Sequence, residues 1–215
     1  MKFIHRLGQM GRRFSAAGGG GSGSSTTWSP TDIVAALGSG ALSGGNLVVT
    51  LDGSNPSLVR ATAGATGSKR YCEITVGTGT GNKNDTYFGL HRSDVSYSSS
   101  AGSILNQGDG TAFTGGSSGC TYVSSATAYN TGDVLMLAVD TTSGTASSRK
   151  AWFGKNGTWF NGDPAAGTGG SWHSLAAGVD WRPYVYKGNS GSWGFTLNVG
   201  NTAFAYSPPS GFSAF

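Results

Sequence analysis

The sequence predicts an all-β fold: an antiparallel β-sandwich preceded by an extended or short-helical N-terminal arm. The chain has 38 glycines among 215 residues, and each glycine inside a helix costs about 1 kcal/mol relative to alanine. Short apolar stretches alternate with glycine-rich turns, and no helical period follows residue 40. Aromatic residues make up 11% of the chain, more than a disordered chain would carry, so a packed core is expected.

The strongest single signal is a β-hairpin in the second half of the chain. An unbroken apolar run at residues 134–139 is short enough to be a strand buried on both faces, which places it in the middle of a sheet. A polar loop leads into a second strand at residues 150–154, whose two neighbouring aromatic residues point to opposite faces. Asn156 and Gly157 then form a tight hairpin turn, because both residue types tolerate a positive φ.

Other strands are predicted from short apolar or alternating stretches between turns. They lie at residues 47–51, 58–63, 71–76, 87–90, 122–123, 184–186 and 195–199. The first two of these are expected to pair with each other. Cys72 alternates with polar residues and reads as a small buried apolar side chain. A disulfide between Cys72 and Cys120 remains an alternative.

The N-terminus has a character of its own. Residues 1–26 hold four basic residues and no acidic one, which leaves ten of each sign for the rest of the chain. We divide the chain into an arm at residues 1–17, a flexible Gly/Ser-rich linker at 18–26 and a sandwich domain at 27–215. Four apolar residues of the arm fall at helical spacing, on one face. We expect the arm to dock on a partner through Phe3, Leu7, Met10, Arg12, Arg13 and Phe14.

Several functions are not expected from this composition. Four cations in a short arm are a weak signal for nucleic acid. Near the N-terminus there is no apolar segment of a secretory signal, and nowhere are there the roughly 20 consecutive apolar residues of a membrane span. We therefore expect neither nucleic-acid binding nor a membrane span.

Catalysis is not expected either. A glycoside hydrolase needs two carboxylates that flank the scissile bond, but Glu73 is the one glutamate and most aspartates sit in turns, where their side chains cap the backbone. The histidines and cysteines are not at zinc-ligand spacing. Asp85 and Asp94 are retained as a minor alternative for a Ca²⁺ site. We predict a protein that is no enzyme and has neither cofactor nor metal.

Aromatic residues in loops are the better lead to a binding site. Trp159, Trp172 and Trp181 lie in or beside predicted loops. Exposed aromatic rings stack on sugars or anchor protein partners. The alternative for each is that it closes an open end of the sandwich. The predicted recognition surface lies at a loop end and consists of Tyr97, Phe113, Tyr122 and Trp172.

Six motifs, in order, resemble those of the SPRY (B30.2-like) domain family. They are KRYCEITV at residues 69–76, FGL at 88–90, GDVLMLAVD at 132–140, FGKNG at 153–157, RPYV at 182–185, and FTLNVG at 195–200 with PPSGF at 208–212. This resemblance implies a bent, concanavalin-like sandwich of two antiparallel sheets. It also implies non-catalytic binding through loops at one end.

The Gly/Ser/Thr-rich form of the domain in this chain is similar to the SPRY domains of bacteriophage proteins, most clearly at residues 156–159 and 162–168. This similarity implies a virion structural protein that decorates the capsid or belongs to the tail or fibre. Its arm would bind other virion proteins, and its domain would face host-surface glycans or proteins from the particle surface. Assembly into a homo-oligomer is a further expectation. The alternatives are a peptide-binding SPRY module outside a virion and a lectin-like carbohydrate-binding sandwich.

Overall fold

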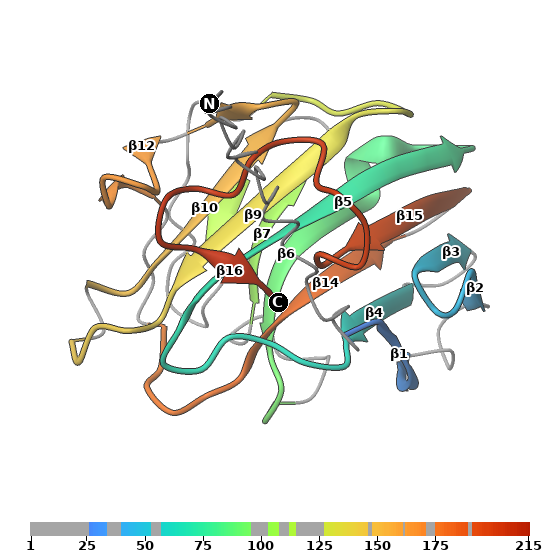
Figure 1. The fold of residues 1–215 in the computed structure, drawn as a ribbon. Helices are drawn as coiled ribbons and strands as arrows, with labels where there is room; N and C mark the ends of the chain where they lie inside the picture. Colours follow the sequence, from blue (N-terminus) through green and yellow to red (C-terminus); the bar gives the residue numbers. More distant parts are fainter. Residues whose placement is uncertain are drawn as a thin grey trace, which may run out of the picture.

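The computed structural model describes two β-sheets packed face to face (Figure 1). It describes residues 26–33, 40–52, 57–95, 103–107, 112–114, 127–145, 148–160, 162–170, 175–188 and 191–215. Within these residues the predicted all-β sandwich is confirmed. The N-terminal arm and almost all of the linker lie outside the described residues.

The first sheet has six antiparallel strands in the order β1-β4-β14-β6-β7-β8. Their bounds are β1 Trp28–Ile33, β4 Ser57–Ala61, β14 Trp181–Lys187, β6 Thr86–Arg92, β7 Ser103–Gln107 and β8 Ala112–Thr114. A short 3-10 turn, η2 (Lys83–Asp85), leads into β6.

The second sheet follows the order β11-β10-β9-β5-β15-β3-β2. Its bounds are β11 Thr158–Trp159, β10 Lys150–Lys155, β9 Val134–Asp140, β5 Lys69–Gly79, β15 Ser192–Asn198, β3 Val48–Asp52 and β2 Gly40–Ser43. The terminal strand β16 (Ser213–Ala214) pairs with β5 in parallel, which departs from the all-antiparallel expectation. Strands β12 (Gly162–Asp163) and β13 (Thr168–Gly169) form a small separate hairpin.

The hairpin of β9 and β10 forms as predicted, and β9 lies between β10 and β5. Leu137 faces the core between the sheets, whereas Met136 faces the outer side of the second sheet. The two aromatic residues of β10 also point to opposite faces. Phe153 enters the central core, and Trp152 is buried on the outer side.

One predicted pairing is wrong. Strands β3 and β4, expected to pair with each other, belong to different sheets: Val49 of β3 pairs with Phe195, and Val59 of β4 pairs with Val185. Both strands bury their apolar side chains in the same core from opposite sides. An apolar pattern shows that a strand has a buried face but not which sheet it joins.

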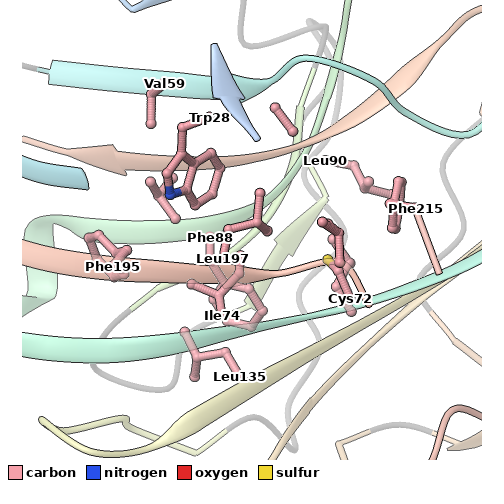
Figure 2. Close-up of a cluster of buried hydrophobic side chains, with 14 of the residues drawn as sticks. Trp28, Val59, Cys72, Ile74, Phe88, Leu90, Leu135, Phe195, Leu197 and Phe215 are labelled. Atoms are coloured by element: carbon pink, nitrogen blue, oxygen red, sulfur yellow. The ribbon is translucent and has the colours of Figure 1, made fainter. Parts of the chain in front are cut away.

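The central core brings residues of both sheets together (Figure 2). Trp28 and Phe88 come from the first sheet and meet Ile74 and Phe195 of the second. Cys72 is a free, buried thiol in this core, so no bridge to Cys120 forms. Burial, with a smaller effect of the neighbouring Glu73, raises the pKa of this thiol well above its usual value.

The C-terminal segment covers the outer side of the second sheet. In Figure 1 it crosses in front of β5, β9 and β10 before it ends in β16. Its aromatic residues Phe204, Tyr206 and Phe212 pack on a cluster that contains Tyr71 and Trp152. This segment explains why β9 and Trp152 are buried on a face that a simple two-sheet sandwich would leave in water.

Candidate binding pocket at the β10–β11 turn

The tight turn between β10 and β11 lies beside a pocket and has a well-defined conformation. Asn156 and Gly157 have φ values of 50° and 84°, as the sequence predicts for a two-residue hairpin turn. The Asn156 side chain anchors the turn: its Oδ1 accepts from the Val134 N–H at 2.8 Å, and its Nδ2 donates to Asp133 at 2.7 Å. The turn is therefore fixed to the start of β9.

Trp159 is held in place directly after this turn. Its ring lies over Gly154, where a Cβ would come within 3.0 Å of the indole and 2.6 Å of the Met136 methyl carbon. The ring also meets Tyr71 edge to face, with centroids 6.2 Å apart. Trp159 is only half-buried, whereas Trp28, Trp152, Trp181 and Trp193 are at most 7% exposed.

An open pocket of about 410 Å³ lies beside Trp159. Its lining residues in the described part of the chain are Thr127, Lys155, Asn156, Thr158, Trp159 and Phe160. Thr127 and Thr158 are exposed. Within the described part of the chain, neither hydroxyl has a hydrogen-bond partner, and neither does the indole N–H of Trp159. The pocket thus combines an aromatic wall with neutral hydrogen-bonding groups.

The charges at the pocket are already compensated. Lys155 donates to the Ala128 carbonyl at 2.6 Å and lies 3.5 Å from the Asp133 carboxylate. Partial burial acts to raise the pKa of Asp133. Hydrogen bonds from the Asn130 N–H and the Asn156 amide, together with Lys155, outweigh this effect and hold the pKa below its usual range. The lysine and the carboxylate therefore form a charged pair with no net charge near pH 7.

The residues that the sequence singled out for binding lie almost entirely outside the described residues. This applies to Phe3, Leu7, Met10, Arg12, Arg13 and Phe14 of the arm and to Tyr97, Tyr122 and Trp172 of the loop end. Phe113 belongs to β8, where its backbone pairs with Leu105 at the edge of the first sheet. Of the loop tryptophans, Trp181 is 3% exposed and closes the core.

Sequence reasoning noted Trp159 but did not include it in the recognition surface. A usable signal was present, because only Thr158 separates the Asn156-Gly157 turn from Trp159 and Phe160. A tight turn leaves little protein beyond it to cover the residues that follow. That these residues line a pocket follows only from the fold, which brings Thr127 beside them.

The carboxylates that sequence reasoning considered for chemistry have structural roles. Glu73 is buried and accepts hydrogen bonds from the N–H groups of Ala205 and Tyr206. Asp94 forms a two-point ion pair with Arg92. Asp163 caps its own turn through the Ala165 N–H. Across the described ranges, no three potential ligand residues gather into a metal site.

A second polar cluster lies on the first sheet. Arg60 is 6% exposed, and its guanidinium binds both oxygens of Asp32 at 2.7 and 2.8 Å. It also donates to the carbonyls of Arg92 and Val95, beside the buried ring of His91. His91 Nδ1 lies 2.9 Å from the Arg92 carbonyl oxygen, which assigns the Nδ1 proton to that contact. These contacts tie β4 to β1 and to the end of β6.

Comparison with solved structures supports the SPRY resemblance at the level of the fold. The SPRY domain of human HERC1 superposes with a TM-score of 0.57 at 15% identity, over 79% of this chain and 96% of that domain. A second human SPRY domain gives a TM-score of 0.55 at 15% identity, over 77% of this chain and 96% of that domain. The chain therefore has the SPRY fold.

Searches with the sequence itself find no match among protein-family models or curated proteins. The likeness thus rests on the arrangement of the strands. In the portion of the chain that the structure describes, no helix has the length and apolar character needed to cross a membrane.

Proposed function

We propose that this chain is a non-catalytic binding protein that presents the β10–β11 pocket to a ligand. The observation that carries the proposal is the half-buried ring of Trp159 in an open pocket with unpaired neutral hydrogen-bonding groups. Pockets of this kind, mostly apolar with a few polar groups, are the usual small-ligand sites of proteins. The SPRY fold supports the proposal, because the family resemblance implies binding and not catalysis.

The finer proposal assigns the chain to a bacteriophage particle. The arm at residues 1–17 would attach the protein to other virion proteins, and the sandwich would be displayed at the particle surface toward host glycans or proteins. Support comes from the apolar spacing and basic charge of the arm, from the Gly/Ser-rich linker and from the similarity to phage-type SPRY sequences.

Removal of the arm tests the attachment. Particles are assembled in a host that expresses either the full chain or the chain without residues 1–17, and the bound protein is quantified after sedimentation. We expect the shortened chain to stay in the supernatant. If it sediments with particles as the full chain does, the arm is not the attachment element.

A narrower variant tests which side chains of the arm matter. Replacing Phe3, Leu7, Met10 and Phe14 by serine removes the apolar face and leaves every charge in place. Gln9→Ala, off that face, is the matched control. We expect loss of sedimentation with the fourfold variant alone.

A further inference from the structure

We propose that the β10–β11 pocket binds a neutral carbohydrate, with one sugar ring stacked on Trp159. The inference rests on the binding function proposed above and names the ligand class of the same pocket. Three properties of the pocket lead to it: a fixed aromatic wall, unpaired neutral hydrogen-bonding groups and a single described charged lining residue, Lys155, whose charge is balanced by the nearby Asp133.

The aromatic wall suits a sugar ring. One side of a pyranose presents mainly C–H groups, which pack on the π face of an indole. Trp159 is held by Gly154 and by Tyr71, so little side-chain freedom is lost when a ligand binds. Phe160 extends the apolar part of the pocket.

The polar groups suit sugar hydroxyls. Thr127 and Thr158 each offer a hydroxyl that both donates and accepts, and Trp159 adds an N–H donor. Sugar hydroxyls likewise donate and accept, so each pairs with any of these groups. The Asn156 side-chain amide already accepts a hydrogen bond from Val134 and donates one to Asp133, and these two bonds fix the turn.

The charge balance argues against an ionic ligand. A phosphate, sulfate or carboxylate needs a free cation, but Lys155 is bonded to the Ala128 carbonyl and paired with Asp133. An ionic group would have to displace these contacts and would lose its own hydration. A neutral ligand carries neither cost.

The dimensions agree with a sugar residue of a longer glycan. The pocket volume of about 410 Å³ falls within the roughly 300–1,000 Å³ of small-ligand sites. The pocket is open, so a glycan chain can continue outward from the ring that stacks on Trp159. A surface-attached polysaccharide is therefore sterically acceptable.

The test presents the full chain to three arrays: neutral oligosaccharides, sialylated, sulfated or phosphorylated oligosaccharides, and peptides. We expect binding to members of the neutral set. Trp159→Ala should abolish this signal. Thr158→Val should weaken binding about fivefold, the effect of one lost hydrogen bond. Thr196→Val, at an exposed strand position on β15, is the matched control and should bind like the wild type.

Each outcome decides the inference. Preference of the wild type for the charged glycans, or unchanged neutral-glycan binding by both Trp159→Ala and Thr158→Val, overturns it. Thermal melting shows whether each variant is folded. If Trp159→Ala unfolds, Thr158→Val decides, because it retains the aromatic packing. Peptide binding that both pocket variants weaken overturns the sugar ligand and preserves the binding function. No binding of the wild type to any array overturns both.

Discussion

The backbone N–H of Tyr206 donates a 2.8 Å hydrogen bond to the carboxylate of Glu73, 133 residues earlier in the chain. The neighbouring Ala205 N–H donates to the same carboxylate at 2.9 Å, and the Tyr71 hydroxyl does so at 3.0 Å. Glu73 is 2% exposed. Three donors thus occupy the one glutamate of the chain, which fastens the C-terminal segment to the second sheet.

This relationship predicts a large effect of Glu73→Ala on stability. The substitution removes the acceptor of the two part-buried N–H groups and leaves the Tyr71 hydroxyl only its longer contact of 3.4 Å to the Tyr206 carbonyl. We expect the free energy of unfolding to fall by about 3 kcal/mol, since hydrogen bonds to charged groups are stronger than neutral ones and unpaired buried donors are costly. Urea denaturation measures the change, with the exposed Thr196→Val as control. A loss no larger than that of the control would show that the segment is held by its aromatic residues alone.

Substitution of Leu137, at the centre of β9, is expected to destabilise the fold. Leu137 is fully buried between the sheets. We expect Leu137→Ala to lower the free energy of unfolding by about 2–5 kcal/mol through lost burial and the cavity that remains. Leu137→Asp should abolish folding, because it adds an unpaired buried charge. Circular dichroism melting tests both variants, and a wild-type melting temperature for Leu137→Asp would refute the placement of this side chain in the core.

Comparison of Gly157 with Gly45 separates the cost of a positive φ from the cost of a steric clash with Tyr206. Its φ of 84° is strained for any other residue, and a Cβ there would lie 2.9 Å from the Tyr206 ring. Gly45 has a similarly positive φ of 68° but open space around it. We expect Gly157→Ala to destabilise the fold by about 1–3 kcal/mol more than Gly45→Ala. Equal losses in denaturant titrations would mean that the turn does not pack on Tyr206.

His91 predicts a dependence of stability on pH. Burial lowers the pKa of its ring, and Arg60 acts in the same direction, against the raising effects of the Arg92 carbonyl and Asp32. The unfolded chain therefore takes up this proton at a higher pH, near 6.5, than the folded chain. The His91 contribution is fully favourable above that pH and is lost as pH falls toward the folded pKa.

The variant His91→Gln tests this dependence. It removes the titrating group and keeps a donor for the Arg92 carbonyl. Unfolding free energies are measured at pH 7.5 and pH 5.5, above the range in which most carboxylates titrate. We expect a smaller loss between the two values than in the wild type. An equal loss would place the titrating group elsewhere.

Much of the strand content was predictable from local patterns. The unbroken apolar run of β9, the alternation in β5 and β15 and the Asn156-Gly157 turn all appear as expected. Strands β1, β2, β7, β8, β11–β13 and β16 were missed, because stretches of two to six residues are too short to show a clear period.

The sequence by itself determined the all-β character, the central hairpin and its turn, since these depend on spacing and φ preferences within a few residues. Tertiary structure alone decided that β3 and β4 lie in different sheets, that Glu73 binds the C-terminal segment and that Trp159 lines an open pocket. Each of these rests on contacts between segments far apart in the chain. From the sequence one can predict that an apolar residue is buried or that an acidic residue is paired. The residue that it contacts is determined only by how the sheets and the C-terminal segment pack.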